Sequence, residues 1–136
     1  MSCAGGLGLA PSVQAQERLP ATVTAVVDGD TVDAQVTGGP ALEVQVIGID
    51  APEPGDCGGE QATDYMEDLA LGRAVTLVSD PALEQFESPG NRPLFYVDRG
   101  DGLDVGLELL RAGWAEIWEL SDFLRSSAYM ATEQTA

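Results

Sequence analysis

One stretch, residues 45–53, constrains this chain more than any other, because an apolar strand there leads directly into two carboxylates beside a proline. Pro52 has a fixed φ and favours an extended conformation at Ala51. We therefore expect Asp50 and Glu53 to leave the end of the strand in fixed, different directions. Two acids in such a place suit a hard cation, which takes oxygen ligands, together with a general base. The same residue types are also typical of an ordinary turn after a strand, so this stretch alone leaves both interpretations open.

A second acidic motif, VDGDTV at residues 27–32, precedes the VIGIDAPE motif of residues 46–53. The pair resembles the staphylococcal nuclease (thermonuclease) family, whose members carry DGDT and a D-[TA]-P-E turn at a similar separation. The resemblance continues through GGEQAT, through Arg92 in NRPLFYV, and through LDVGLELLRAGWAEI. It covers most of the chain, residues 20–118, and the ordered set is more specific than either acidic motif alone.

The resemblance implies both a fold and a metal site. The fold would be of the α+β class, a five-stranded OB-fold barrel with about three helices. The metal would be one calcium ion (Ca2+), held by the carboxylates of Asp30 and Asp50 and by the backbone oxygen of Ala51. Calcium takes about six to eight oxygen ligands, so water would complete its shell. We interpret Asp28 as a residue of the hairpin turn.

The resemblance also assigns two catalytic residues. Glu53 matches the glutamate that orients or deprotonates the attacking water, and Arg92 matches one of two arginines that stabilise the transition state. Position 45, where the family has the other arginine, is glutamine. Glutamine donates only a neutral hydrogen bond, and loss of one transition-state donor costs on the order of 10²–10³ in rate. Trp118 has two interpretations, a stacking surface for a base or an ordinary core residue.

Composition limits the chain to one soluble-type domain, since it has 136 residues, 44% of them hydrophobic. No apolar run approaches the ~20 residues of a membrane span. Histidine is absent, which excludes histidine-based catalysis, and all six basic residues are arginine. The formal net charge of -17 disfavours the binding of a polyanion such as DNA to most of the surface. A salty environment would screen that repulsion, because the Debye length falls to about 3 Å at 1 M salt.

The N-terminal part differs from the rest of the chain. Residues 1–19 are small and mildly apolar and end near a Val-Gln-Ala sequence, which is typical of a truncated signal peptide or a flexible tail. Residues 20–136 form the predicted nuclease-like domain, which we expect to be secreted or held in the cell envelope and to be a monomer. The two cysteines, Cys3 and Cys57, allow one disulfide without showing that it forms.

Alternating and helical patterns give the order of the elements. Strands are predicted by alternation at residues 21–27, 32–36, 42–49, 74–78 and 93–97. Helices are predicted after Gly58, then over residues 105–112 with Asp104 as N-cap, and finally after Ser121 with Phe123, Leu124 and Ala128 facing inward.

Two functions follow from these observations. The first is a calcium-dependent phosphodiesterase that hydrolyses DNA or RNA slowly, as the missing arginine implies. The second is a non-catalytic OB-fold module that has kept the fold, with or without the calcium site. Gln45 and the acidic surface favour the second function, whereas Asp30, Asp50, Glu53 and Arg92 together favour the first. A periplasmic or cell-surface protein-binding domain is a third class that no motif supports.

Overall fold

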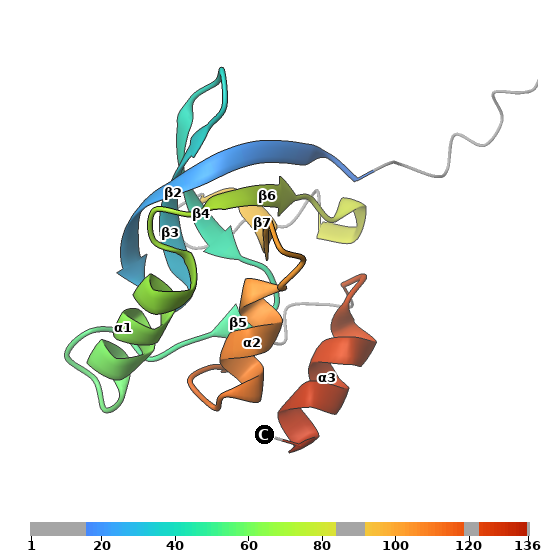
Figure 1. Ribbon diagram of the computed structural model, residues 1–136. Coiled ribbons are helices and arrows are strands. Elements are labelled where there is room, and N and C mark those ends of the chain that lie inside the picture. The colour runs from blue at the N-terminus through green and yellow to red at the C-terminus, as the bar shows by residue number, and fades with distance from the viewer. Residues whose placement is uncertain (1–15, 84–91, 119–122, 136) are drawn as a thin grey trace, which may run out of the picture.

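The computed structural model describes residues 16–83, 92–118 and 123–135. Within them, a closed barrel is built in the strand order β2-β3-β4-β7-β6 (Figure 1). β4 pairs with β7 in parallel, and the other neighbouring strands are antiparallel. The barrel strands are β2 (Arg18–Asp28), β3 (Thr31–Val36), β4 (Ala41–Val46), β6 (Ala74–Val78) and β7 (Leu94–Arg99). The predicted class, a five-stranded barrel with helices, is confirmed, and the barrel fits an OB-like fold.

The first hairpin brings an acidic turn to the end of the next strand. β2 and β3 are joined so that Asp28 pairs with Thr31 across the turn. Val32, Ala34 and Val36 are buried in the barrel, as their alternation predicted. On the other side of β3, Thr31 pairs with Gln45 of β4. The acidic hairpin turn therefore lies beside the last residues of β4.

The strand predicted over residues 42–49 is wrong at its end. β4 stops at Val46, and a separate short strand, β5 (Ile49–Asp50), pairs with β8 (Glu116–Ile117). The break lies at Gly48, whose φ is 85° and where an added Cβ would lie 2.8 Å from the ring of Phe123. The positive φ and this close approach both require glycine. The chain therefore turns out of the barrel just before Asp50.

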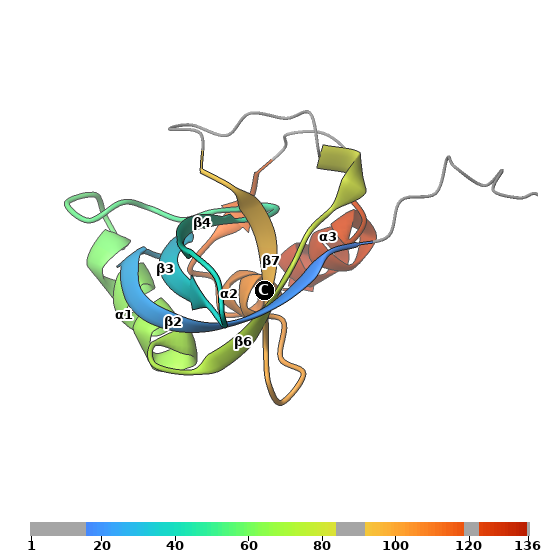
Figure 2. The ribbon, with the colours of Figure 1, turned by 90° about the horizontal axis from the view of Figure 1, so that it is seen from above.

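The first helix, α1 (Gly59–Ala70), begins after Gly58 as predicted. Its buried face consists of Ala62, Met66 and Ala70, which share one side of the helix. Gly72 has a φ of 76° and ends the helix. In Figure 1 this helix lies below the barrel strands, and Figure 2 views the barrel and helices from above.

The later helices confirm one prediction and correct another. Asp104 is the N-cap of α2 (Val105–Arg111) and accepts a hydrogen bond from the backbone N–H of Leu107 at 3.2 Å. The last helix, α3 (Ser126–Thr135), begins later than predicted, and Ser121 lies outside the described residues. A short 3-10 turn, η2 (Pro81–Leu83), follows β6.

The inward face predicted for the last helix is wrong in two of three positions. Phe123 is buried, but Leu124 and Ala128 are exposed. Tyr129 is the buried residue of α3, and its hydroxyl donates to the carboxylate of Asp104 at 2.9 Å. This long-range contact sets which side of α3 faces the protein.

Several predictions about the chain ends stay predictions. β2 begins at Arg18, and Glu17 donates its backbone N–H to Ser79 Oγ at 2.7 Å, so the barrel starts within the stretch assigned to the tail. Residues 1–15, including Cys3, lie outside the described part, whereas Cys57 is exposed. Among the described helices, none has the length and apolar character needed to cross a membrane.

Candidate active site

A cavity of about 270 Å³ opens where the first hairpin, the end of β4 and the start of β7 meet. All four side chains predicted for the site line it, although they come from separate segments of the chain. Among the described residues, the lining consists of Asp28, Asp30, Gln45, Asp50, Glu53, Arg92 and Trp118. The remaining predicted position, Ala51, is buried beside it.

Asp30 is the most constrained acid of the cavity. Its Oδ2 accepts a hydrogen bond from the backbone N–H of Ala51 at 2.9 Å, and its Oδ1 accepts one from Thr31 Oγ1 at 2.9 Å. The first of these bonds ties the hairpin turn directly to the proline turn. Burial and the neighbouring Asp28 carboxylate raise the pKa of Asp30 to about 7, against the opposing effect of the Ala51 N–H. A nearby positive charge would favour the ionised form of this carboxyl group.

Asp28 has two roles in the geometry. Its Oδ1 accepts the backbone N–H of Asp30 at 3.0 Å, which confirms the predicted function in the hairpin turn. Asp28 also lines the cavity, a position that sequence reasoning missed. The alternation of acids in DGD was the available indication, since the two aspartates flank a single glycine.

Asp50 and Glu53 are exposed acids at the mouth of the cavity. Neither carboxylate accepts a hydrogen bond from a side chain or backbone group in the described part of the chain. Both therefore keep their oxygen lone pairs available to a cation, to water or to a ligand.

Two glycines fix the loop that carries these acids. A Cβ at Gly59 would lie 1.8 Å from the carbonyl oxygen of Glu53, and one at Gly29 would lie 2.7 Å from the Cβ of Ala51. The start of α1 therefore packs against the backbone of the proline turn and the acidic hairpin against the side chain of Ala51, and no larger residue fits at either contact. The backbone of residues 51–53 is thus positioned from both sides.

Arg92 is held by two acceptors from the same face of β4. Its Nε donates to Glu43 Oε2 at 2.5 Å, and its Nη1 lies 3.5 Å from Gln45 Oε1. Gln45 is buried, and its Oε1 is also 3.5 Å from Thr31 Oγ1. The contact with Glu43 was missed, although the spacing of residues 43 and 45 along one strand places both on one face.

Trp118 follows β8 and is half-buried, with its backbone N–H donated to the carbonyl of Gly48 at 3.0 Å. It lines the cavity and is not part of the buried core. Of the two interpretations of this residue, the geometry favours an aromatic surface at the edge of the cavity.

The oxygen atoms at this cavity suit a hard cation that takes only a few of its ligands from the protein and the rest from water. Among the described residues, no three acidic, cysteine or histidine side chains gather closely enough to hold a metal ion by themselves. A cation here would take carboxylate oxygens from Asp30 and Asp50, a backbone oxygen, and water for the remainder. Oxygen ligands with several waters are within the normal range for calcium.

The comparisons with known proteins found two relatives that are named as endonucleases. No known protein-family model matches the sequence. Two curated relatives, from Escherichia coli O157:H7 and Escherichia coli, each carry the name "Uncharacterized endonuclease" and are 34% identical to the chain over 97 residues. The matched region is 71% of this chain but 60% of each relative, so the chain spans about three-fifths of their length. The resemblance to staphylococcal nuclease stays a prediction.

Proposed function

We propose that this chain is a calcium-dependent phosphodiesterase that hydrolyses nucleic acid, DNA or RNA. The observation that carries the proposal is the meeting of Asp30, Asp50, Glu53 and Arg92 at one cavity. A nuclease needs a cation site, a base for water and a positive donor for the phosphate, and these residue types supply each of them. The endonuclease name of the two relatives supports the same reaction class.

Asp30, Asp50 and the backbone oxygen of Ala51 would hold the cation. When bound, a divalent cation acts as a Lewis acid that withdraws charge from a phosphoryl oxygen. The bond from the Ala51 N–H to Asp30 keeps the two acidic turns in register at this point. The fixed backbone on both sides of the turn lowers the reorganisation that binding would require.

Glu53 would accept a proton from the attacking water. Its carboxylate is exposed at the cavity and its loop is fixed by the contact with Gly59. Arg92 would donate to the phosphate oxygens as negative charge develops on them. Glu43 holds Nε of Arg92, which orients the guanidinium on the β4 side of the cavity.

A non-catalytic OB-fold module is the second candidate. It is favoured by Gln45, which brings no charge to the cavity, and by Glu43, which offsets the charge of Arg92. In that case the fold and the cation site would persist without hydrolysis.

An activity assay separates the two candidates. The purified chain is incubated with single-stranded DNA, duplex DNA and RNA, in millimolar calcium or in excess chelator, over a range of salt. We expect slow, calcium-dependent cleavage that is lost in Glu53→Gln. Cleavage that persists in chelator or in Glu53→Gln would contradict the proposed site, and no cleavage of any substrate would favour the non-catalytic module.

A further inference from the structure

The positive charge of this chain is mostly taken up by internal ion pairs. The chain has six arginines and no lysine. Four of the arginines pair with carboxylates: Arg92 with Glu43, Arg99 with Asp101, Arg111 with Glu108, and Arg125 with Asp98 and Asp104. A protein that grips a nucleic acid strand neutralises several phosphates with cationic side chains. This chain has few cations to spare for that purpose.

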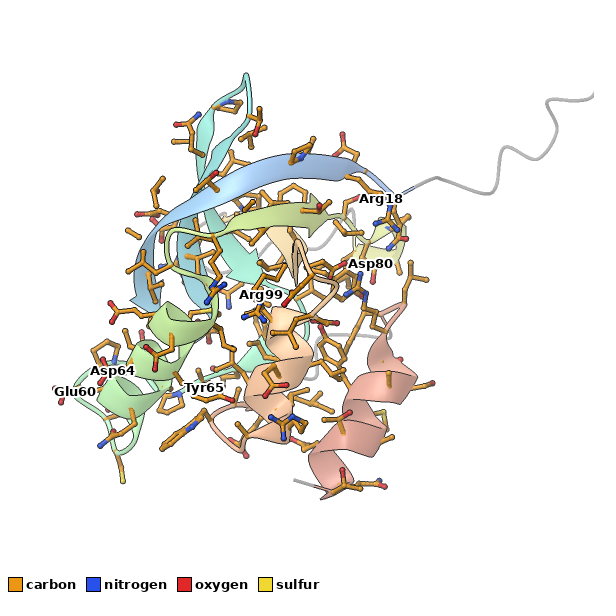
Figure 3. All side chains as sticks on the ribbon, viewed as in Figure 1. Arg18, Glu60, Asp64, Tyr65, Asp80 and Arg99 are labelled. Atoms are coloured by element: carbon orange, nitrogen blue, oxygen red, sulfur yellow. The ribbon has the colours of Figure 1, made fainter. Side chains whose placement is uncertain are left out.

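The other two arginines lie away from the cavity lining. Arg18 is at the start of β2, paired with Val78 at the end of β6, and in Figure 3 it is well separated from Glu60 and Asp64 of α1. Arg73 follows α1, and its carbonyl accepts the N–H of Val23. Neither residue lines the cavity. They do not form a continuous basic path with Arg92 through the lining.

The surface next to the cavity is acidic. The described part of the cavity lining has four carboxylates and one guanidinium. Beyond Glu53 the chain continues through Asp56 and Glu60, which are both exposed. Two like charges about 4 Å apart repel by about 1 kcal/mol even in bulk water. Phosphates next to the scissile one would therefore meet repulsion instead of a counter-charge.

The cavity is small, which agrees with a site that takes only a short part of a nucleic acid strand. Its volume of about 270 Å³ is at the lower limit of ligand pockets, which span roughly 300–1,000 Å³. Trp118 in its lining offers an aromatic face on which one base could stack.

We infer that the site engages a single phosphodiester, so that its substrates include dinucleotides and other short diesters as readily as long strands. The inference rests on the proposed function and adds the substrate class. Binding of single-stranded nucleic acid weakens with salt by a log–log slope of about −0.7 for each phosphate neutralised. A site that uses the scissile phosphate alone gives a slope shallower than about −1.

The test compares substrate lengths. The specificity constant kcat/KM, divided by the number of cleavable bonds, is measured in calcium for a dinucleoside monophosphate and for a single-stranded oligonucleotide of about twenty residues. We expect the two values to agree within about threefold. A larger advantage for the oligonucleotide would overturn the inference while leaving the proposed function intact. Failure to hydrolyse either substrate would overturn the proposed function, and the inference with it.

A matched pair of variants checks the electrostatic cause. Asp56→Lys/Glu60→Lys reverses two charges near Glu53, and we expect it to raise kcat/KM severalfold for the oligonucleotide but not for the dinucleotide. Glu67→Lys/Asp68→Lys makes the same change of charge later on α1, about 10 Å further along the helix axis. We expect it to raise kcat/KM for the oligonucleotide by a smaller factor. Equal effects of the two pairs on the oligonucleotide, or an equal gain on both substrates, would contradict the proposed cause.

Discussion

Two acidic clusters of this molecule use the same residue types in opposite ways. In one, where β7, α2 and α3 meet, the carboxylates of Asp98 and Asp104 both bind Arg125, at 2.7 Å each. In the other, the cavity at the end of β4, Asp50 and Glu53 accept no hydrogen bond from a described residue. In the first cluster an arginine binds both carboxylates, whereas in the second the described ion-pair partner of Arg92 is Glu43, outside the cavity lining.

The first cluster, which we call the joint, connects the residue just before α3 to β7 and to the N-cap of α2. Arg125 also lies over the ring of Tyr96, 4.2 Å from its centroid. The adjacent Asp80 accepts hydrogen bonds from the Tyr96 hydroxyl at 2.5 Å and from the backbone N–H of Leu124 at 2.8 Å. Hydrogen bonds to the two carboxylates raise the pKa of Arg125. Every partner needed to attach α3 to the barrel is therefore present.

The cavity, in contrast, holds carboxylates close to one another. Asp28 and Asp30 lie next to each other, and the pKa of Asp30 is raised by burial and by this neighbour. Like charges that are held together by the fold lower its stability unless something else binds to them. The joint places Arg125 between the two carboxylates, whereas in the cavity Asp50 and Glu53 accept no hydrogen bond from a described residue.

Of the substitutions considered, Glu53→Gln should have the largest effect on activity. A small effect would contradict the contrast between a catalytic cavity and a structural cluster. Removing a general base costs about 10²–10⁴ in rate, so we expect kcat to fall by at least about a hundredfold. The melting temperature should hardly change, because Glu53 is exposed. The assay is the initial rate of diester hydrolysis in saturating calcium. A variant that keeps most of its activity would remove Glu53 from the mechanism.

Arg125→Met should show the opposite pattern. Two partly buried carboxylates would lose their counter-charge, which we expect to lower the free energy of unfolding by about 2–3 kcal/mol, below the range for fully buried pairs. Urea unfolding measures this change. Arg111→Met is the control, since the Arg111 side chain is exposed and an ion pair made by an exposed arginine should contribute less than about 1 kcal/mol. Equal effects of the two substitutions would contradict the assignment of the joint.

Gln45→Arg tests whether the missing positive charge at position 45 limits the rate. It would restore a second cationic donor for the phosphate, and we expect kcat to rise by about tenfold or more, a conservative share of the usual donor effect. The gain should disappear in the Glu53→Gln background, because a better-stabilised transition state still needs an activated water. An unchanged rate, with calcium binding retained, would favour the non-catalytic module.

The sequence predicted the barrel because alternation and turn residues act locally. It missed the break at Gly48, because an apolar run through residues 46–49 looks like one continuous strand. It also missed the face of α3, which depends on the contact of Tyr129 with Asp104, far apart in the chain. Neither error follows from a weak local pattern, since both depend on long-range packing.

The site was predictable to a similar extent. The two acidic turns were expected to meet, and they do, through the bond from Ala51 to Asp30. The pairing of Arg92 with Glu43 was not expected, because it depends on the parallel contact of β4 with β7. Pairing between strands distant in sequence is not encoded in the local pattern of either strand.

Calcium-dependent thermal unfolding tests the central claim most directly. A ligand that binds only the folded state stabilises it by about 2.7 kcal/mol at a hundred times its dissociation constant. We predict that calcium raises the melting temperature of the wild type, that Asp50→Asn abolishes most of the shift, and that Asp98→Asn retains it despite a lower starting stability. No shift in the wild type, or an undiminished shift in Asp50→Asn, would contradict a cation site in the cavity.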